Sequence, residues 1–103
     1  MDKREAIEII NRYVETLATL GIKVEKTMLF GSYATGKYHE GSDIDIVVIS
    51  KDFQGMGFWD RIDVLGKALA ILFEPIEATA MTPEEFESGG SMIALFAKEG
   101  EEV

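Results

Sequence analysis

The 103-residue chain contains no cysteine, and this absence excludes three kinds of site. A disulfide framework, a thiol nucleophile and a cysteine-ligated zinc or iron–sulfur centre all need that side chain. His39 is the only histidine, so a metal motif built on two histidines of this chain is excluded as well. The composition is 47% hydrophobic and 28% charged, with two prolines and ten glycines. These values predict one globular domain over residues 1–103.

Basic residues are also scarce. Ten lysines and arginines stand against nineteen acidic residues, which gives a net charge of −9. A protein that binds a nucleic-acid backbone by itself needs a basic surface, so we expect no direct nucleic-acid binding. No apolar run approaches the roughly 18 residues of a membrane span, and the charged segment 1–5 leads into no signal-like apolar stretch. We therefore expect a cytoplasmic protein that does not associate with membranes.

The hydrophobic pattern predicts alternating helices and strands. Helical spacing or capping signals mark four segments: residues 3–20, a helix capped by Asp60, a helix that starts at Thr82-Pro83, and one or two turns within 91–98. Runs of apolar and β-branched residues predict three strands: 26–30, 44–49 and 76–80. This order predicts a small α/β (α+β) fold, in which helices flank a three- to four-stranded mixed sheet.

Three stretches carry no such pattern. Residues 31–42 contain three glycines and predict a loop with one helical turn at most. Residues 50–58 predict a mobile loop, and the aromatic residues at its end suggest a surface for a partner or for self-association. The acidic segment 99–102 predicts a solvated tail.

Two aspartates introduce the strand at 44–49. Strand side chains alternate between faces, so Asp43 and Asp45 project to the same side, about 7 Å apart along the strand. Two like charges at that separation are costly unless a cation lies between them. No basic residue is close in sequence, and hard divalent cations prefer carboxylate oxygens. The pair therefore favours a metal site.

A third carboxylate strengthens this interpretation. Glu77 interrupts the apolar strand at 76–80, whereas its rival Glu74 precedes Pro75 at the strand's edge. If the two strands are neighbours, Asp43, Asp45 and Glu77 converge, and three carboxylates can hold two Mg²⁺ ions. Glu77 could also accept the proton of an attacking hydroxyl.

Gly31 and Ser32 supply a complementary feature where the strand at 26–30 ends. A glycine lets backbone N–H groups approach a phosphate closely, and the serine hydroxyl adds a neutral donor. A helical turn that begins after the serine would direct its positive end to the same anion. The pair therefore favours a phosphate-binding turn.

These residues resemble a known family. Leu29-Phe30-Gly31-Ser32, ten residues and then Asp43-Ile44-Asp45 resemble the signature of the DNA polymerase β-like nucleotidyltransferase superfamily. The short length is similar to that of its minimal nucleotidyltransferases (MNT). The resemblance implies the nucleotidyltransferase fold and assigns the nucleotide phosphates to Gly31 and Ser32. It assigns metal binding and catalysis to Asp43, Asp45 and Glu77.

The resemblance further implies a Mg²⁺-dependent enzyme that transfers a nucleoside monophosphate, AMP from ATP, to a hydroxyl and releases pyrophosphate. Minimal members are commonly encoded with a helical HEPN partner as the antitoxin of a toxin–antitoxin pair. In that pairing the acceptor is a tyrosine of the toxin. The acidic surface also favours a protein acceptor over a nucleic acid.

Two departures from the family pattern favour a second hypothesis. The third acid is usually aspartate, and here it is the longer Glu77. Many relatives carry an arginine soon after the glycine–serine pair, whereas here the nearest cation is Lys37, either a surface residue or a nucleotide ligand. The alternative is a catalytically weak or inactive module on the same fold, which acts as an antitoxin by binding its partner.

Overall fold

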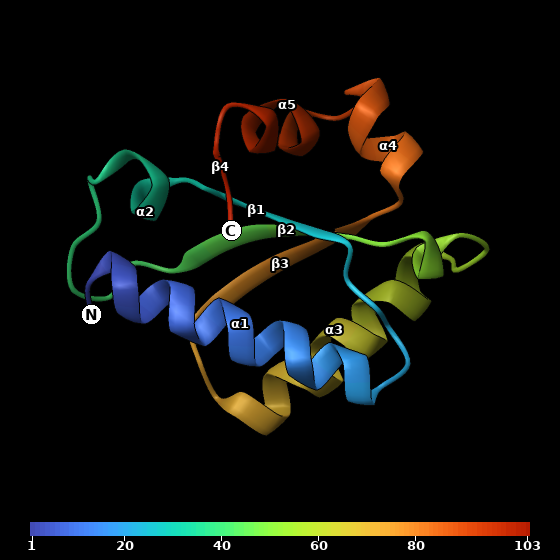
Figure 1. Ribbon diagram of the computed structural model, residues 1–103, viewed down its shortest axis with the longest axis horizontal. Helices are drawn as coiled ribbons and strands as arrows, with labels where there is room; N and C mark the ends of the chain where they lie inside the picture. The colour runs from blue at the N-terminus through green and yellow to red at the C-terminus, as the bar shows by residue number, and fades with distance from the viewer.

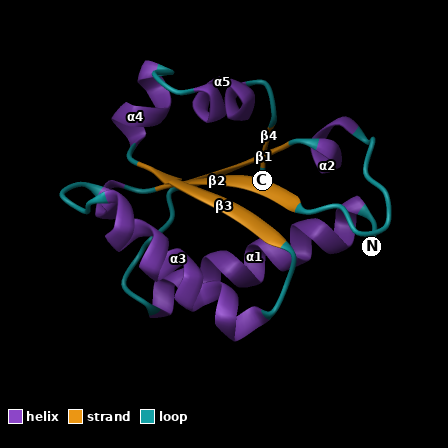
Figure 2. Ribbon diagram, turned by 180° about the vertical axis from the view of Figure 1, so that it is seen from behind, coloured by secondary structure: helices purple, strands orange, loops and turns teal.

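The computed structural model describes all residues from 1 to 103 and has three layers (Figures 1 and 2). A four-stranded sheet lies between helices α1 and α3 on one face and helices α4 and α5 on the other. None of the helices combines the length and the apolar character that crossing a membrane requires. The elements are α1 (Lys3–Thr19), β1 (Lys26–Phe30), α2 (Ser32–Thr35), β2 (Ile44–Ile49), the 3-10 helix η1 (Lys51–Phe53), α3 (Phe58–Leu72), β3 (Ile76–Met81), α4 (Pro83–Ser88), α5 (Met92–Lys98) and β4 (Glu101–Glu102).

The sheet is mixed, as the sequence predicts, and has the strand order β3-β2-β1-β4. β1 runs antiparallel to both β2 and β4, whereas β2 and β3 are parallel. A parallel pair needs a long crossover, which α3 provides. The end of β1 therefore meets the starts of β2 and β3, and Phe30, Asp45 and Glu77 face one another across the three strands. This end of the sheet collects the residues that the motif singles out.

Hydrophobic residues cover both faces of β2. Ile44, Ile46 and Val48 belong to the core of fifteen buried residues beneath α1 and α3. Val47 and Ile49 belong to a smaller core of seven buried residues beneath α4 and α5. Since side chains alternate along a strand, Asp45 lies on the same face as Val47, beside this smaller core. The Asp45 side chain is therefore only partly buried.

Local signals explain most of the element boundaries. The Asp2 carboxylate caps α1 by accepting the N–H of Glu5 at 2.9 Å. Thr82 and Glu85 form a reciprocal capping box at the start of α4, and Pro83 occupies its first turn. The predicted strands are confirmed within one residue, and the fourth strand comes from the C-terminal segment.

The predicted start of the second long helix at Asp60 is wrong. α3 begins at Phe58 with Gly57 as its N-cap, and Asp60 lies in the first turn. An acid in that turn is favourable because the free N–H groups of the helix carry partial positive charge. An acidic residue near a helix start can therefore be the N-cap or lie in the first turn, and the sequence does not distinguish the two.

The segment 50–58 is held to the core rather than free, contrary to the predicted mobile loop. Phe53 is fully buried at the end of η1. The Arg61 guanidinium donates to the Phe53 carbonyl oxygen at 3.0 Å and to that of Met56 at 3.1 Å. The turn that contains the glycines at 55 and 57 is therefore held in place by Phe53 and Arg61.

The prediction of a solvated tail at 99–102 is also wrong. Glu101 and Glu102 pair with Leu29 and Met28 of β1, and the Val103 N–H donates to the Thr27 carbonyl at 2.9 Å. The free edge of β1 offers backbone partners, which any residue can use whatever its side chain. The two glutamate side chains remain accessible to solvent, so their charge does not oppose the pairing.

Candidate functional site

Three strand ends place the predicted site residues side by side. Gly31 follows β1, Asp45 lies in β2, and Glu77 lies directly opposite Asp45 in β3. The negative charge of Glu77 acts on the Asp45 carboxyl group from this neighbouring position. Asp43 precedes β2 by one residue and is exposed. The structure thus brings two of the predicted carboxylates together and leaves the third beside them.

The electrostatics of Asp45 reflect this crowding. Burial raises the pKa of its carboxyl group above the ordinary value, and the negative charges of Glu77 and Asp43 raise it further. A hydrogen bond with Glu77 acts in the same direction. None of the four ion pairs of the chain involves these carboxylates. The cluster therefore lacks a compensating cation from the chain itself.

The donor set fits a magnesium ion, although the side chains are not preassembled around one. Carboxylate oxygens are the ligands that this hard cation prefers. No group of three or more histidine, cysteine or acidic side chains in the structure has an arrangement that could hold a metal ion. A shared metal site of Asp43, Asp45 and Glu77 therefore stays a prediction.

Gly31 is required by the backbone and by its neighbour. Its φ angle is 73°, in the region that side chains disfavour. A Cβ atom there would collide with Oδ2 of Asp45 and would lie 3.2 Å from its Cγ. The Gly31 backbone thus packs directly against the Asp45 carboxyl group. Any larger residue would displace one or the other.

The short helix α2 begins at Ser32, which is half-buried. Its first backbone bonds run from the N–H groups of Ala34 and Thr35 to the Gly31 carbonyl, at 3.1 and 3.2 Å. The N–H groups of Ser32 and Tyr33 come before these bonds and have no partner within the helix. Together with the serine hydroxyl, they can donate to an anion.

Packing holds this loop in place. The buried Tyr33 ring stacks on Tyr38, with centroids 4.6 Å apart and planes inclined by 12°. Ser42 accepts the His39 N–H at 2.9 Å through its hydroxyl. Lys37 is exposed on the same loop and takes part in none of the four ion pairs. Its role as a nucleotide ligand stays a prediction.

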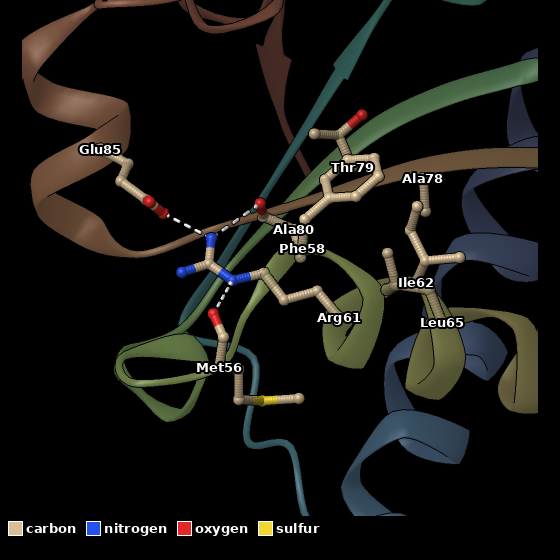
Figure 3. Close-up of a pocket in the computed structure, with 9 residues that line it drawn as sticks. All are labelled: Met56, Phe58, Arg61, Ile62, Leu65, Ala78, Thr79, Ala80 and Glu85. Atoms are coloured by element: carbon tan, nitrogen blue, oxygen red, sulfur yellow. Dashed lines mark hydrogen bonds and ion pairs between the residues drawn. The ribbon is translucent and has the colours of Figure 1, made fainter.

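Sequence reasoning missed Arg61, whose side chain is only 17% exposed. Besides holding residues 53–56, the guanidinium donates to Glu85 at 2.7 Å (Figure 3). This hydrogen bond lowers the pKa of Glu85. An arginine on an amphipathic helix normally indicates a solvated face, so no sequence signal marked it. Arg61 thus ties α3 to α4 beside the outer edge of β3.

The comparisons with known proteins agree with this geometry. A family model described as "Nucleotidyltransferase domain" matches residues 7–98. The chain is 43% identical over 49 residues to "Putative protein adenylyltransferase MJ0141" of Methanocaldococcus jannaschii, and the match covers 47% of this chain. It covers 50% of that protein, so the chain spans about half the length of the curated relative.

Two solved structures are similar in fold. The first is described as a putative nucleotidyltransferase from Sulfolobus solfataricus, with a TM-score of 0.68 and 23% identity over 84% of this chain and 75% of that one. The second is described as a toxin–antitoxin with AMP-PNP, with a TM-score of 0.52 and 24% identity over 86% of this chain and 81% of that one. At such identities the similarity concerns the fold alone, which confirms the predicted fold class.

Proposed function

The chain belongs to the nucleotidyltransferase domain family, and from this membership we propose that it transfers AMP from ATP to a hydroxyl group of a partner protein. The observation that carries the proposal is the pairing of Asp45 with Glu77 beside Gly31. This pairing puts the two halves of the sequence motif and the third acid at one end of the sheet. The match to a protein named as an adenylyltransferase supports AMP as the transferred group.

The acidic surface supports a protein acceptor. A net charge of −9 repels a nucleic-acid backbone, which is itself negatively charged. The partner that we propose is a helical protein of the HEPN type, as in toxin–antitoxin pairs. The fold similarity to a toxin–antitoxin with AMP-PNP is consistent with ATP and such a partner.

The residues of the chain have distinct roles in this reaction. The Ser32 hydroxyl and the first N–H groups of α2 bind the phosphates, because they are the free donors beside Gly31. The acceptor oxygen attacks the α-phosphorus of ATP, and a new oxygen–phosphorus bond forms. The bond from that phosphorus to the bridging oxygen breaks, so pyrophosphate leaves. Glu77 accepts the hydroxyl proton, since its carboxylate is exposed and lies next to Asp45.

Asp43, Asp45 and Glu77 would hold Mg²⁺, which when bound supplies positive charge that stabilises the phosphate oxygens. The two carboxylates that already face each other, Asp45 and Glu77, lose their mutual repulsion when a cation binds. Binding of the cation should therefore also lower the pKa of Asp45.

Calorimetric titration of ATP in the presence of Mg²⁺ tests the nucleotide site. We expect the wild type to bind, Asp45→Asn to lose binding, and Glu40→Gln to bind like the wild type. Glu40 is an exposed loop acid, so its variant controls for the loss of one negative charge. Failure of the folded wild type to bind ATP would contradict the proposal and favour the second candidate.

The second candidate is a module that binds its partner without transferring AMP. The longer Glu77 and the lack of an arginine after Ser32 favour it. A transfer assay with labelled ATP and the purified partner separates the two. A Glu77→Gln variant that transfers AMP at the full rate would remove this residue as the proton acceptor.

A further inference from the structure

Two adjoining cavities form a groove along the outer edge of β3, the border strand of the sheet. The larger cavity, about 520 Å³, lies between β3 and the first half of α3 (Figure 3). The smaller one, about 240 Å³, continues along β3 to Glu77. Both are lined by Ile62, Leu65 and Ala78, so they lie next to each other, and we call them together the edge groove.

The backbone of β3 presents unused hydrogen-bonding groups to this groove. Ser50 donates its N–H to the Met81 carbonyl at 3.0 Å, so Met81 bonds towards β2. In a parallel pair, alternate residues bond to a given neighbour, and those between them face away. Ala80 and Ala78 therefore face outwards, and Arg61 donates to the Ala80 carbonyl from that side at 3.5 Å. No strand pairs with this edge, which leaves the Ala78 N–H and C=O free.

A glycine in the middle of α3 adds a second observation. Gly66 lines the smaller cavity, and a Cβ atom there would meet nothing within 4 Å. Packing within the chain therefore does not require glycine, although glycine weakens a helix interior. A glycine without an internal reason suits the close approach of another backbone. The apolar side chains of Phe58, at the other end of the groove, and of Ile62, which lines both cavities, are 67% and 43% exposed.

We propose that the edge groove binds an extended segment of the acceptor protein as an added strand beside β3. This inference rests on the proposed AMP transfer and names its substrate as a strand-forming segment. Backbone groups of the segment pair with those of Ala78, as in other cases of strand addition to a free sheet edge. A docked helix would leave these groups unpaired, because its own N–H and C=O groups already bond within the helix.

The alternation of side chains then places the hydroxyl group. Ala78 and Ala80 project towards the core beneath α1 and α3, whereas Glu77 projects to the opposite face with Asp45. In the added strand, a residue opposite Ala78 would project into the groove, where apolar side chains are favoured. Its neighbour opposite Glu77 would project towards the carboxylates, with Cβ atoms about 5 Å apart. The substrate motif is therefore an apolar residue adjacent to a hydroxyl residue.

Charge favours a foreign segment over a second copy of the chain. The two cations of α3 are already paired, Arg61 with Glu85 at 2.7 Å and Lys67 with Asp63 at 3.0 Å. Glu77 at one end of the groove is exposed and belongs to none of the four ion pairs. Two chains that each carry a net charge of −9 would repel each other at this edge. A segment with lysine or arginine flanking the apolar–hydroxyl motif matches the groove.

The test is a selection of random short peptides displayed on phage against the folded wild-type chain, followed by calorimetry with the synthetic peptides selected. We expect period-two alternation, with hydroxyl residues in the phase opposite to the apolar ones. Gly66→Gln should raise the melting temperature, because glutamine favours a helix more than glycine does, yet weaken peptide binding by about ten-fold or more. An Ile62→Asp variant should weaken binding similarly, and Lys51→Gln, outside the groove, should not.

Methylation of the peptide's backbone nitrogens tests strand pairing directly. Methylation at every second amide should abolish binding in one phase and leave it unchanged in the other, because only one set of amides faces β3. The inference is overturned if no peptide is selected, if the selected apolar residues recur with helical spacing, or if both methylated peptides bind equally. It is also overturned if the edge is occupied by a second copy, seen as a dimer in sedimentation that Gly66→Gln dissociates.

Peptide binding tests the docking segment, and ATP binding tests the proposed function, so the two can fail independently. Calorimetry with the wild-type chain measures peptide binding without ATP and Mg²⁺, and ATP binding without peptide, so each outcome is obtained separately. Peptide binding without any ATP binding by the wild type would retain the docking segment and overturn the AMP transfer. ATP binding without peptide binding would do the reverse.

Discussion

Asp45→Asn should make the metal-free chain more stable, although it removes a residue of the proposed site. Burial and the charges of Glu77 and Asp43 raise the pKa of Asp45, so its ionised form is unfavourable in the folded chain. A like charge about 5 Å away, with solvent access, repels by about 1 kcal/mol. For a domain of this size, relief of that amount should raise the melting temperature by about 4–8 °C.

The pH dependence of stability tests a second time whether Asp45→Asn stabilises the chain. A pKa that is raised in the folded state means that the folded chain binds more protons, so stability falls as pH rises through that pKa. The gain of the variant should therefore be full at neutral pH. It should shrink as the pH falls through the raised pKa towards the ordinary value of 3.8.

Differential scanning calorimetry in EDTA measures this effect, with Glu40→Gln as the control for net charge. Added Mg²⁺ should reverse the order, since a free concentration about ten times the dissociation constant stabilises the wild type by about 1.4 kcal/mol. A variant whose melting temperature in EDTA equals that of the wild type or Glu40→Gln would refute the carboxylate repulsion.

Three further changes test other parts of the site. Gly31→Ala should lower the free energy of unfolding by about 1–3 kcal/mol and abolish ATP binding in calorimetry. Gly36 also has a positive φ angle, but no atom lies near its missing Cβ, so Gly36→Ala should destabilise the fold and leave ATP binding intact. Equal ATP affinity of both variants would contradict the close contact at Gly31. Arg61→Met should cost about 2–3 kcal/mol in urea unfolding, because it removes the hydrogen bonds of the guanidinium to the Phe53 and Met56 carbonyls and to the Glu85 carboxylate. An unchanged midpoint would exclude the anchoring role. Tyr38→Ala should cost about 1 kcal/mol through the lost stack on Tyr33 and speed amide exchange in residues 31–42, and unaltered exchange would show that the stack does not hold the loop.

The central strands were predictable because their signals are local. The run Ile44–Ile49 is apolar on both faces, and a strand covered on both sides requires that pattern. The capping box at Thr82 likewise marks a helix start by residues three positions apart. In contrast, β4 depends on the free edge of β1, some seventy residues away in the chain, and two glutamates carry no strand propensity.

The candidate site divides in the same way. The glycine–serine turn and the paired aspartates are visible as spacing, and their approach to Glu77 required only that two strands be neighbours. The register that puts Glu77 opposite Asp45 is a tertiary property, since it is set by how α3 returns the chain to the sheet. Arg61 and the edge groove were not predictable, because their meaning depends on carbonyl groups and cavities that exist only in the folded chain.

Because β2 and β3 pair in a fixed register, an insertion of an odd number of residues at the start of β3 would move Glu77 to the other face of the sheet. Pro75 meets the start of β2 through its carbonyl, which accepts the Ile44 N–H at 2.8 Å. One extra residue after Pro75 would bring Ile76 opposite Asp45 and turn Glu77 towards α1 and α3. The crossover can therefore lengthen freely in its surface turns, but between Pro75 and Glu77 the chain admits no single-residue insertion. Divergent relatives should vary in length before Pro75 and keep a constant two-residue step from there to the third acid.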